Sequence, residues 1–97
     1  MTTAQIKCEK ELKRLLAKYN VELIHGEVIT TGESKYFKGK FLEFTIDISK
    51  DSFEVYVEGE NHRDEIWLEK WDYENDEEWI NDYLRRVELI LLKGSIH

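Results

Sequence analysis

The sequence contains no proline, a single cysteine and no long apolar run. Without proline there are no Pro-rich linkers, no X-Pro isomerisation and no proline breaks within a helix. Because Cys8 is alone, no disulfide can form within the chain. The longest apolar run, Val87–Leu92, is interrupted by Glu88 and is much shorter than the ~20 residues that span a bilayer. These absences, together with a polar start that predicts no signal peptide, favour a cytoplasmic protein.

The 97 residues, 41% hydrophobic and 12% aromatic, suffice for one folded domain spanning residues 1–97. The net charge of −7 is unevenly distributed. Residues 1–20 carry five basic residues against two acids, whereas residues 60–82 carry ten acids against Arg63 and Lys70. An acidic surface repels nucleic acid and membranes and attracts basic partners, although acidity also keeps small proteins soluble.

Two segments have the periodicity of amphipathic helices. In Thr2–Asn20, Thr2 and Gln5 have the spacing of a capping box, and most of the bases lie opposite the apolar stripe. In Asn75–Lys93 the first turn is acidic, as the helix dipole favours, and Gly94 stands where a helix stop is expected. The predicted buried positions are Ala4, Cys8, Leu12, Leu15, Leu16 and Tyr19 in the first helix, and Ile80, Tyr83, Leu84, Val87, Ile90 and Leu91 in the second.

Four segments between these helices are typical of β-strands. Their β-branched and aromatic residues alternate with polar ones, most clearly in the second and third. Short connections favour an antiparallel meander. The predicted class is therefore α+β, in the order α-β-β-β-β-α, with the sheet packed against both helices. The strands are predicted at Val21–Thr30, Phe37–Ile48, Phe53–Glu58 and Glu65–Trp71, with turns at Thr31–Ser34 and Ser49–Ser52 and a polar loop at Gly59–Asp64.

The sequence predicts neither an enzyme nor a cofactor or metal site. His25, His62 and His97 lack the spacing of metal ligands, and Cys8 falls on the apolar stripe of the first helix. No glycine-rich phosphate loop is present. The acidic stretch that begins at Asp72 lacks the glycine and glutamate that a calcium loop requires. Helix capping by this stretch is favoured, and weak cation binding is its alternative.

The most informative prediction concerns the second face of the sheet. If the alternating apolar residues face the helices, the period of two places the remaining side chains on the opposite face. This face combines large aromatic rings with carboxylates, and exposed clustered aromatics often mark an interface. The residues predicted there are Phe41, Glu43, Thr45, Asp47, Glu54, Tyr56, Glu58, Trp67 and Trp71.

We therefore predict a protein-interaction module that docks a basic protein, such as a toxin or a nucleic-acid-binding enzyme, and binds neither nucleic acid nor a membrane. Small acidic proteins of this class include immunity proteins that neutralise nuclease toxins and phage-encoded inhibitors that mimic nucleic acid, although no motif supports a family. The predicted partner-binding residues are Phe41, Glu43, Tyr56, Glu58, Trp67, Trp71, Asp72, Glu74, Asp76 and Glu77.

Three alternatives remain open at this point. A helix, the Tyr36–Phe37 segment or the loop after Trp71 could cover the second face, which would make Trp67 and Trp71 part of a secondary core. The same aromatic face, or an edge strand, could form a homodimer. A pocket between sheet and helices could recruit His25, His62 and Tyr36 with a carboxylate, as in a small-molecule binder or small enzyme.

Overall fold

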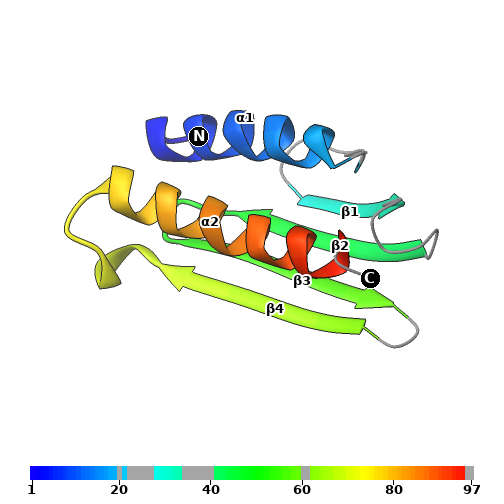
Figure 1. The fold of residues 1–97 in the computed structure, drawn as a ribbon. Helices are drawn as coiled ribbons and strands as arrows, with labels where there is room; N and C mark the ends of the chain where they lie inside the picture. Colours follow the sequence, from blue (N-terminus) through cyan, green and yellow to red (C-terminus); the bar gives the residue numbers. More distant parts are fainter. Residues whose placement is uncertain (20, 22–27, 34–40, 60–61, 96–97) are drawn as a thin grey trace.

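The computed structural model describes residues 1–19, 21, 28–33, 41–59 and 62–95, and for 28–33, 41–43, 62 and 93–95 it describes the backbone alone. Both helices cover the same face of an antiparallel sheet and lie beside each other (Figure 1). The elements in chain order are α1 (Thr3–Lys18), β1 (Val28–Glu33), β2 (Phe41–Ile48), β3 (Ser52–Gly59), β4 (His62–Glu69), the 3-10 turn η2 (Lys70–Asp72) and α2 (Asp76–Ser95).

The structure confirms the predicted α+β class, with two helices packed on an antiparallel sheet, but not the predicted number of strands. Strands β2, β3 and β4 form a three-stranded antiparallel meander that both helices cover, which gives the arrangement α-β-β-β-α. Strand β1 pairs with the outer edge of β2, with a register shift between Ile29 and Thr31. The helix-covered unit thus has three strands, where the sequence predicted four.

Helix α1 begins as its sequence predicts. The Thr2 hydroxyl accepts a hydrogen bond from the Gln5 backbone N–H at 3.1 Å, and the Gln5 side chain accepts one from the Thr2 N–H at 2.7 Å. This reciprocal pair satisfies two N–H groups that a helix start leaves unpaired. Of the predicted stripe only Leu15 is half-exposed, and the Cys8 thiol is fully buried. Burial, and secondarily the charge of Glu9, raises the pKa of this thiol to about 12, as befits a core residue.

Several strand boundaries differ from the prediction. Thr31, Gly32 and Glu33 belong to β1, where a turn was expected. Residues 22–27 of the predicted first strand and 37–40 of the predicted second strand lie outside the described residues. Within the predicted loop at Gly59–Asp64, Gly59 belongs to β3 and residues 62–64 belong to β4, because Gly59 pairs with His62. The predicted turn at Ser49–Ser52 is confirmed by a Ser49 N–H to Ser52 carbonyl bond of 3.0 Å.

Helix α2 supplies the largest side chain of the core, Trp79, which the predicted stripe omitted. Its ring stacks on Phe53 with centroids 3.7 Å apart, and its indole N–H donates to the Leu68 carbonyl at 3.0 Å. Trp79 and Phe53 belong to one hydrophobic cluster that joins the two helices to the inner face of the sheet. The helix also continues through Gly94, so the predicted stop at that glycine was wrong.

Candidate functional site

The face of the sheet that points away from the helices is open among the described residues. Phe44, Phe53, Val55 and other alternating residues are buried under the helices, which confirms the predicted inner face. The period of two turns their neighbours outward. Register then defines three cross-strand rows on the outer face: Asp47, Glu54 and Trp67; Thr45, Tyr56 and Glu65; Glu43, Glu58 and Arg63. We call these residues the outer face.

Trp67 is the largest side chain of the outer face and is 59% exposed. It stands opposite Glu54 on β3, and Glu54 stands opposite Asp47 on β2. Side chains directly opposite each other on adjacent strands have Cβ atoms about 5 Å apart. An exposed indole therefore lies directly across from the Glu54 carboxylate, and Asp47 follows one strand further along the same row.

The outer face also carries one base that the sequence prediction placed in a loop. Arg63 lies in β4 because the hairpin with β3 begins at His62. Its guanidinium carbon lies 5.5 Å from the centroid of the Tyr56 ring, which is within the range of a cation–π contact. Of the predicted acidic aromatic face, Tyr56, Trp67 and the carboxylates of Asp47, Glu54 and Glu58 lie on the outer face, whereas Trp71 does not, and the base Arg63 was missed.

The carboxylates of the outer face repel one another. The pKa of Glu54 is raised above its usual value, first by burial and then by the charges of Asp47 and Glu65. Within the part of the chain that the structure describes, no cluster of three or more His, Cys, Asp or Glu side chains is arranged to hold a metal ion. The mutual repulsion of these carboxylates makes the face receptive to an incoming positive charge.

This repulsion predicts an unusual stability profile. Because the folded pKa of Glu54 is raised, its ionisation destabilises the fold, and this cost is complete above the folded pKa and absent below the unfolded value of about 4.5. Glu54→Gln should therefore stabilise the protein at neutral pH by about 0.2–1 kcal/mol, the range of cross-strand pairs. Urea unfolding across pH 3–8 measures the difference, which should vanish at the acidic end.

The double variant Glu54→Gln/Asp47→Asn is the control for that measurement. In the Glu54→Gln background, Asp47→Asn should raise the free energy of unfolding by less than it does in the wild-type protein. The reason is that Glu54→Gln has already removed the repulsion between the two carboxylates. A Glu54→Gln protein that is less stable than wild type at neutral pH would contradict the proposed repulsion.

Trp71 lies beyond the end of β4, in the turn η2, and not on the strand where it was predicted. Its ring is 65% exposed, and its indole N–H donates to the carboxylate of Glu69, the last residue of β4. This bond ties Trp71 to the end of the strand that carries Trp67. The two tryptophans therefore belong to adjoining parts of one surface.

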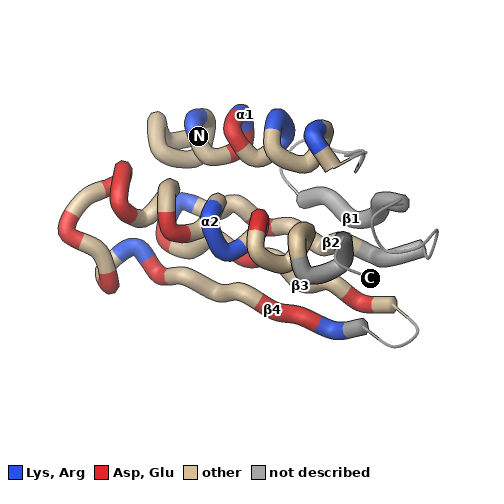
Figure 2. The backbone as a smooth tube through the Cα atoms, viewed as in Figure 1, with Lys and Arg blue, Asp and Glu red and all other residues tan. Residues whose placement is uncertain are grey.

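A pocket of about 330 Å³ opens beside Trp71, between the β2–β3 turn and the start of α2. The backbone bond from the Lys70 N–H to the Asp51 carbonyl, 2.8 Å long, joins the β2–β3 turn to the start of η2. The pocket combines an aromatic wall with carboxylates and one base, and Figure 2 shows acidic residues gathered along the turn before α2. Its lining residues are Asp51, Lys70, Trp71, Tyr73, Glu74, Asn75 and Asp76.

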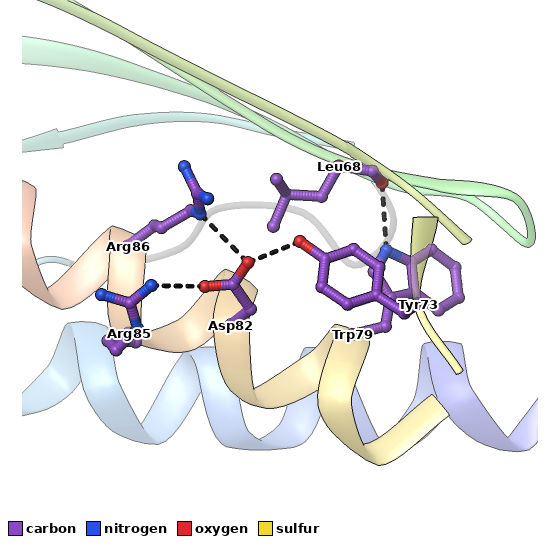
Figure 3. Close-up of polar contacts among 6 residues, drawn as sticks. All are labelled: Leu68, Tyr73, Trp79, Asp82, Arg85 and Arg86. Atoms are coloured by element: carbon purple, nitrogen blue, oxygen red, sulfur yellow. Dashed lines mark hydrogen bonds and ion pairs between the residues drawn. The ribbon is translucent and has the colours of Figure 1, made fainter. Parts of the chain in front are cut away.

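The segment that carries Trp71 is fastened to α2 by Asp82. The Tyr73 hydroxyl and the Arg86 guanidinium donate to one oxygen of this carboxylate, at 2.5 and 3.2 Å, and Arg85 donates to the other at 2.7 Å (Figure 3). The Tyr73 bond lowers the pKa of Asp82, helped by both arginines against the effect of burial. Burial, followed by the Asp82 bond and charge, raises the pKa of Tyr73 to about 12. The contact thus holds η2 in place over a wide pH range.

The predicted partner-binding residues fall into three groups. Tyr56, Glu58 and Trp67 lie on the outer face, while the backbone register puts Glu43 in the same rows. The side chains of Phe41 and Glu43 lie outside the described residues. The remaining predicted residues lie around η2 and the first turn of α2, where all of them are exposed: Trp71, Asp72, Glu74, Asp76 and Glu77.

Acidic residues at the start of α2 also have a structural role. The Asn75 side chain accepts a hydrogen bond from the Glu78 N–H at 2.9 Å, which caps the start of the helix. The Glu78 carboxylate in turn accepts from the Glu74 N–H at 3.4 Å, one residue before the expected position. Capping accounts for Asn75 and Glu78, whereas the carboxylates of Glu74 and Asp76 are left to line the pocket.

No family model matches the chain, and no curated protein or solved structure resembles it at a significant level. Within the described ranges, no helix has the length and apolar character needed to cross a bilayer.

Proposed function

We propose that this chain is a protein-interaction module that docks a basic protein partner through the outer face and the adjoining surface at Trp71. The observation that carries the proposal is the exposed Trp67 ring set among carboxylates on a sheet face that neither helix covers. Tryptophan is one of the side chains enriched among the energetic anchors of protein interfaces.

The charges around these rings favour a basic partner. Asp47, Glu54, Glu58 and Glu65 share the outer face with Arg63 as its one base among the described side chains. A negative surface of this kind accelerates the encounter with a positive one and disfavours acidic partners. Nucleic acid and anionic membranes carry the wrong charge for this surface.

The partner that fits this chemistry best is an enzyme or toxin with a basic cleft for nucleic acid. The outer face would occupy that cleft and block it, so the module would act as an inhibitor or an immunity protein. The buried lone thiol of Cys8 is compatible with the cytoplasmic location that we propose for it.

Self-association through the outer face is the alternative, and electrostatics weigh against it. A symmetric dimer places the same patch of both copies in contact, so the carboxylates of one copy would meet those of the other. The pKa of Glu54 is raised first by burial and then by the charges of Asp47 and Glu65, and a second set of carboxylates would add to that repulsion. Light scattering at high protein concentration distinguishes the two proposals, and we expect a monomer.

Affinity capture from the native host tests the proposal. We expect wild-type protein to retain a basic protein, and Glu58→Lys to lose it, because the substitution replaces a negative charge of the outer face with a positive one. Glu11→Lys on α1 is the matched control, since it makes the same charge change away from the outer face. Retention by both variants, or by neither, would contradict docking through the outer face.

A further inference from the structure

The outer face already holds one guanidinium group, that of Arg63 on the Tyr56 ring. Tyr56 lies on the central strand β3, and Arg63 lies on β4 in the next cross-strand row. The contact shows which chemistry this surface accommodates: a flat cation laid over an aromatic ring, with carboxylates in the neighbouring positions.

Trp67 offers a second position of the same kind. Arg63, Glu65 and Trp67 follow each other along the outward side of β4, so Trp67 stands about 13 Å along the strand from Arg63. Tryptophan is the best aromatic ring for a cation, and here Glu54 stands directly across from it. The charges of Asp47 and Glu65 act on the same carboxylate.

We infer that the outer face recognises arginine in preference to lysine on its protein partner, and that a partner guanidinium stacks on Trp67 while it pairs with Glu54. The inference rests on the proposed function and specifies the chemistry of the partner. Arginine suits this position because its planar group can stack on the indole and donate two parallel hydrogen bonds to a carboxylate. The lysine ammonium is a compact, strongly hydrated charge that does neither.

Two basic peptides of equal length and charge test the inference, one with arginine and one with lysine at every basic position. Titration calorimetry at low salt measures their affinities for the full chain. We expect the arginine peptide to bind roughly fivefold more tightly or better. Trp67→Leu should abolish this preference and leave weaker, salt-sensitive binding of both peptides.

Glu54→Gln should also reduce the preference, whereas Glu11→Gln on α1 removes one carboxylate away from the outer face and should leave it unchanged. Equal affinity of the two peptides for wild type would overturn the arginine inference while the proposed docking of a basic partner stands. Failure of both peptides to bind at low salt would contradict the inference and the proposed function together.

Discussion

Trp79→Ala is expected to lower the free energy of unfolding by about 3–5 kcal/mol, the usual cost of truncating a buried tryptophan. The side chain is fully buried and stacks on Phe53, and the substitution removes both that contact and the bond to the Leu68 carbonyl. Domains of this size have a total stability of about 5–15 kcal/mol, so the variant should lose a large share of it. Urea unfolding followed by circular dichroism measures the change.

Two further substitutions separate burial from the hydrogen bond. Trp79→Phe keeps a ring in the stack but removes the indole N–H, and we expect a smaller loss of about 1–3 kcal/mol. Trp71→Ala removes an exposed indole and should change stability by no more than about 0.5 kcal/mol. Similar losses from Trp71→Ala and Trp79→Ala would show that the assignment of core and surface tryptophans is wrong.

Trp67→Ala is expected to weaken the complex with the captured basic partner by about 2 kcal/mol, which is roughly thirtyfold in dissociation constant. The reason is that a large exposed ring at the centre of an interface contributes far more than the contacts at its rim. The substitution should leave the stability of the free protein nearly unchanged, because Trp67 is 59% exposed. Titration calorimetry with the purified partner provides both affinities.

Leu89→Ala is the matched control for this prediction. Leu89 is a large apolar residue of α2 that is 52% exposed, and it belongs to the helical layer. The affinity of the control should equal that of wild type. Should Leu89→Ala weaken the complex as much as Trp67→Ala does, the partner binds the helical layer, and the outer face is not the docking site.

The two faces of the sheet were predictable because they depend on a local rule. Phe44, Ile46, Phe53 and Val55 alternate with polar residues, and the period of two then fixes the outward position of Tyr56. The capping box at Thr2 was predictable for the same reason, since its two partners are three residues apart.

The positions of Arg63 and Trp71 were predicted wrongly because they depend on contacts between residues that are distant in sequence. The polar segment 59–64 resembles a loop, and only its pairing with β3 makes Arg63 part of the sheet. Trp71 continues the alternation of β4, but the chain leaves the strand after Glu69, where Lys70 bonds to the Asp51 carbonyl. The local sequence pattern does not show that β3 pairs with segment 62–64 or that the Asp51 carbonyl bonds to Lys70. The pocket at Trp71 could therefore not be predicted.

Trp79 differs from these residues, because the sequence did contain its signal. Trp79, Tyr83 and Val87 are spaced four residues apart and therefore lie on one side of α2. All three are buried. The acidic residues immediately before Trp79 made this turn resemble a solvated helix start, although a helix can be acidic on one side and buried on the other.

Acrylamide quenching of tryptophan fluorescence tests the docking surface most directly. The Trp71→Phe variant retains only Trp67, which is exposed, and Trp79, which is buried, so its quenchable emission reports Trp67. We predict that this emission is readily quenched in the free protein and becomes protected when the basic partner is added. Emission that is already protected in the free protein, or that stays quenchable in the complex, would contradict docking through the outer face.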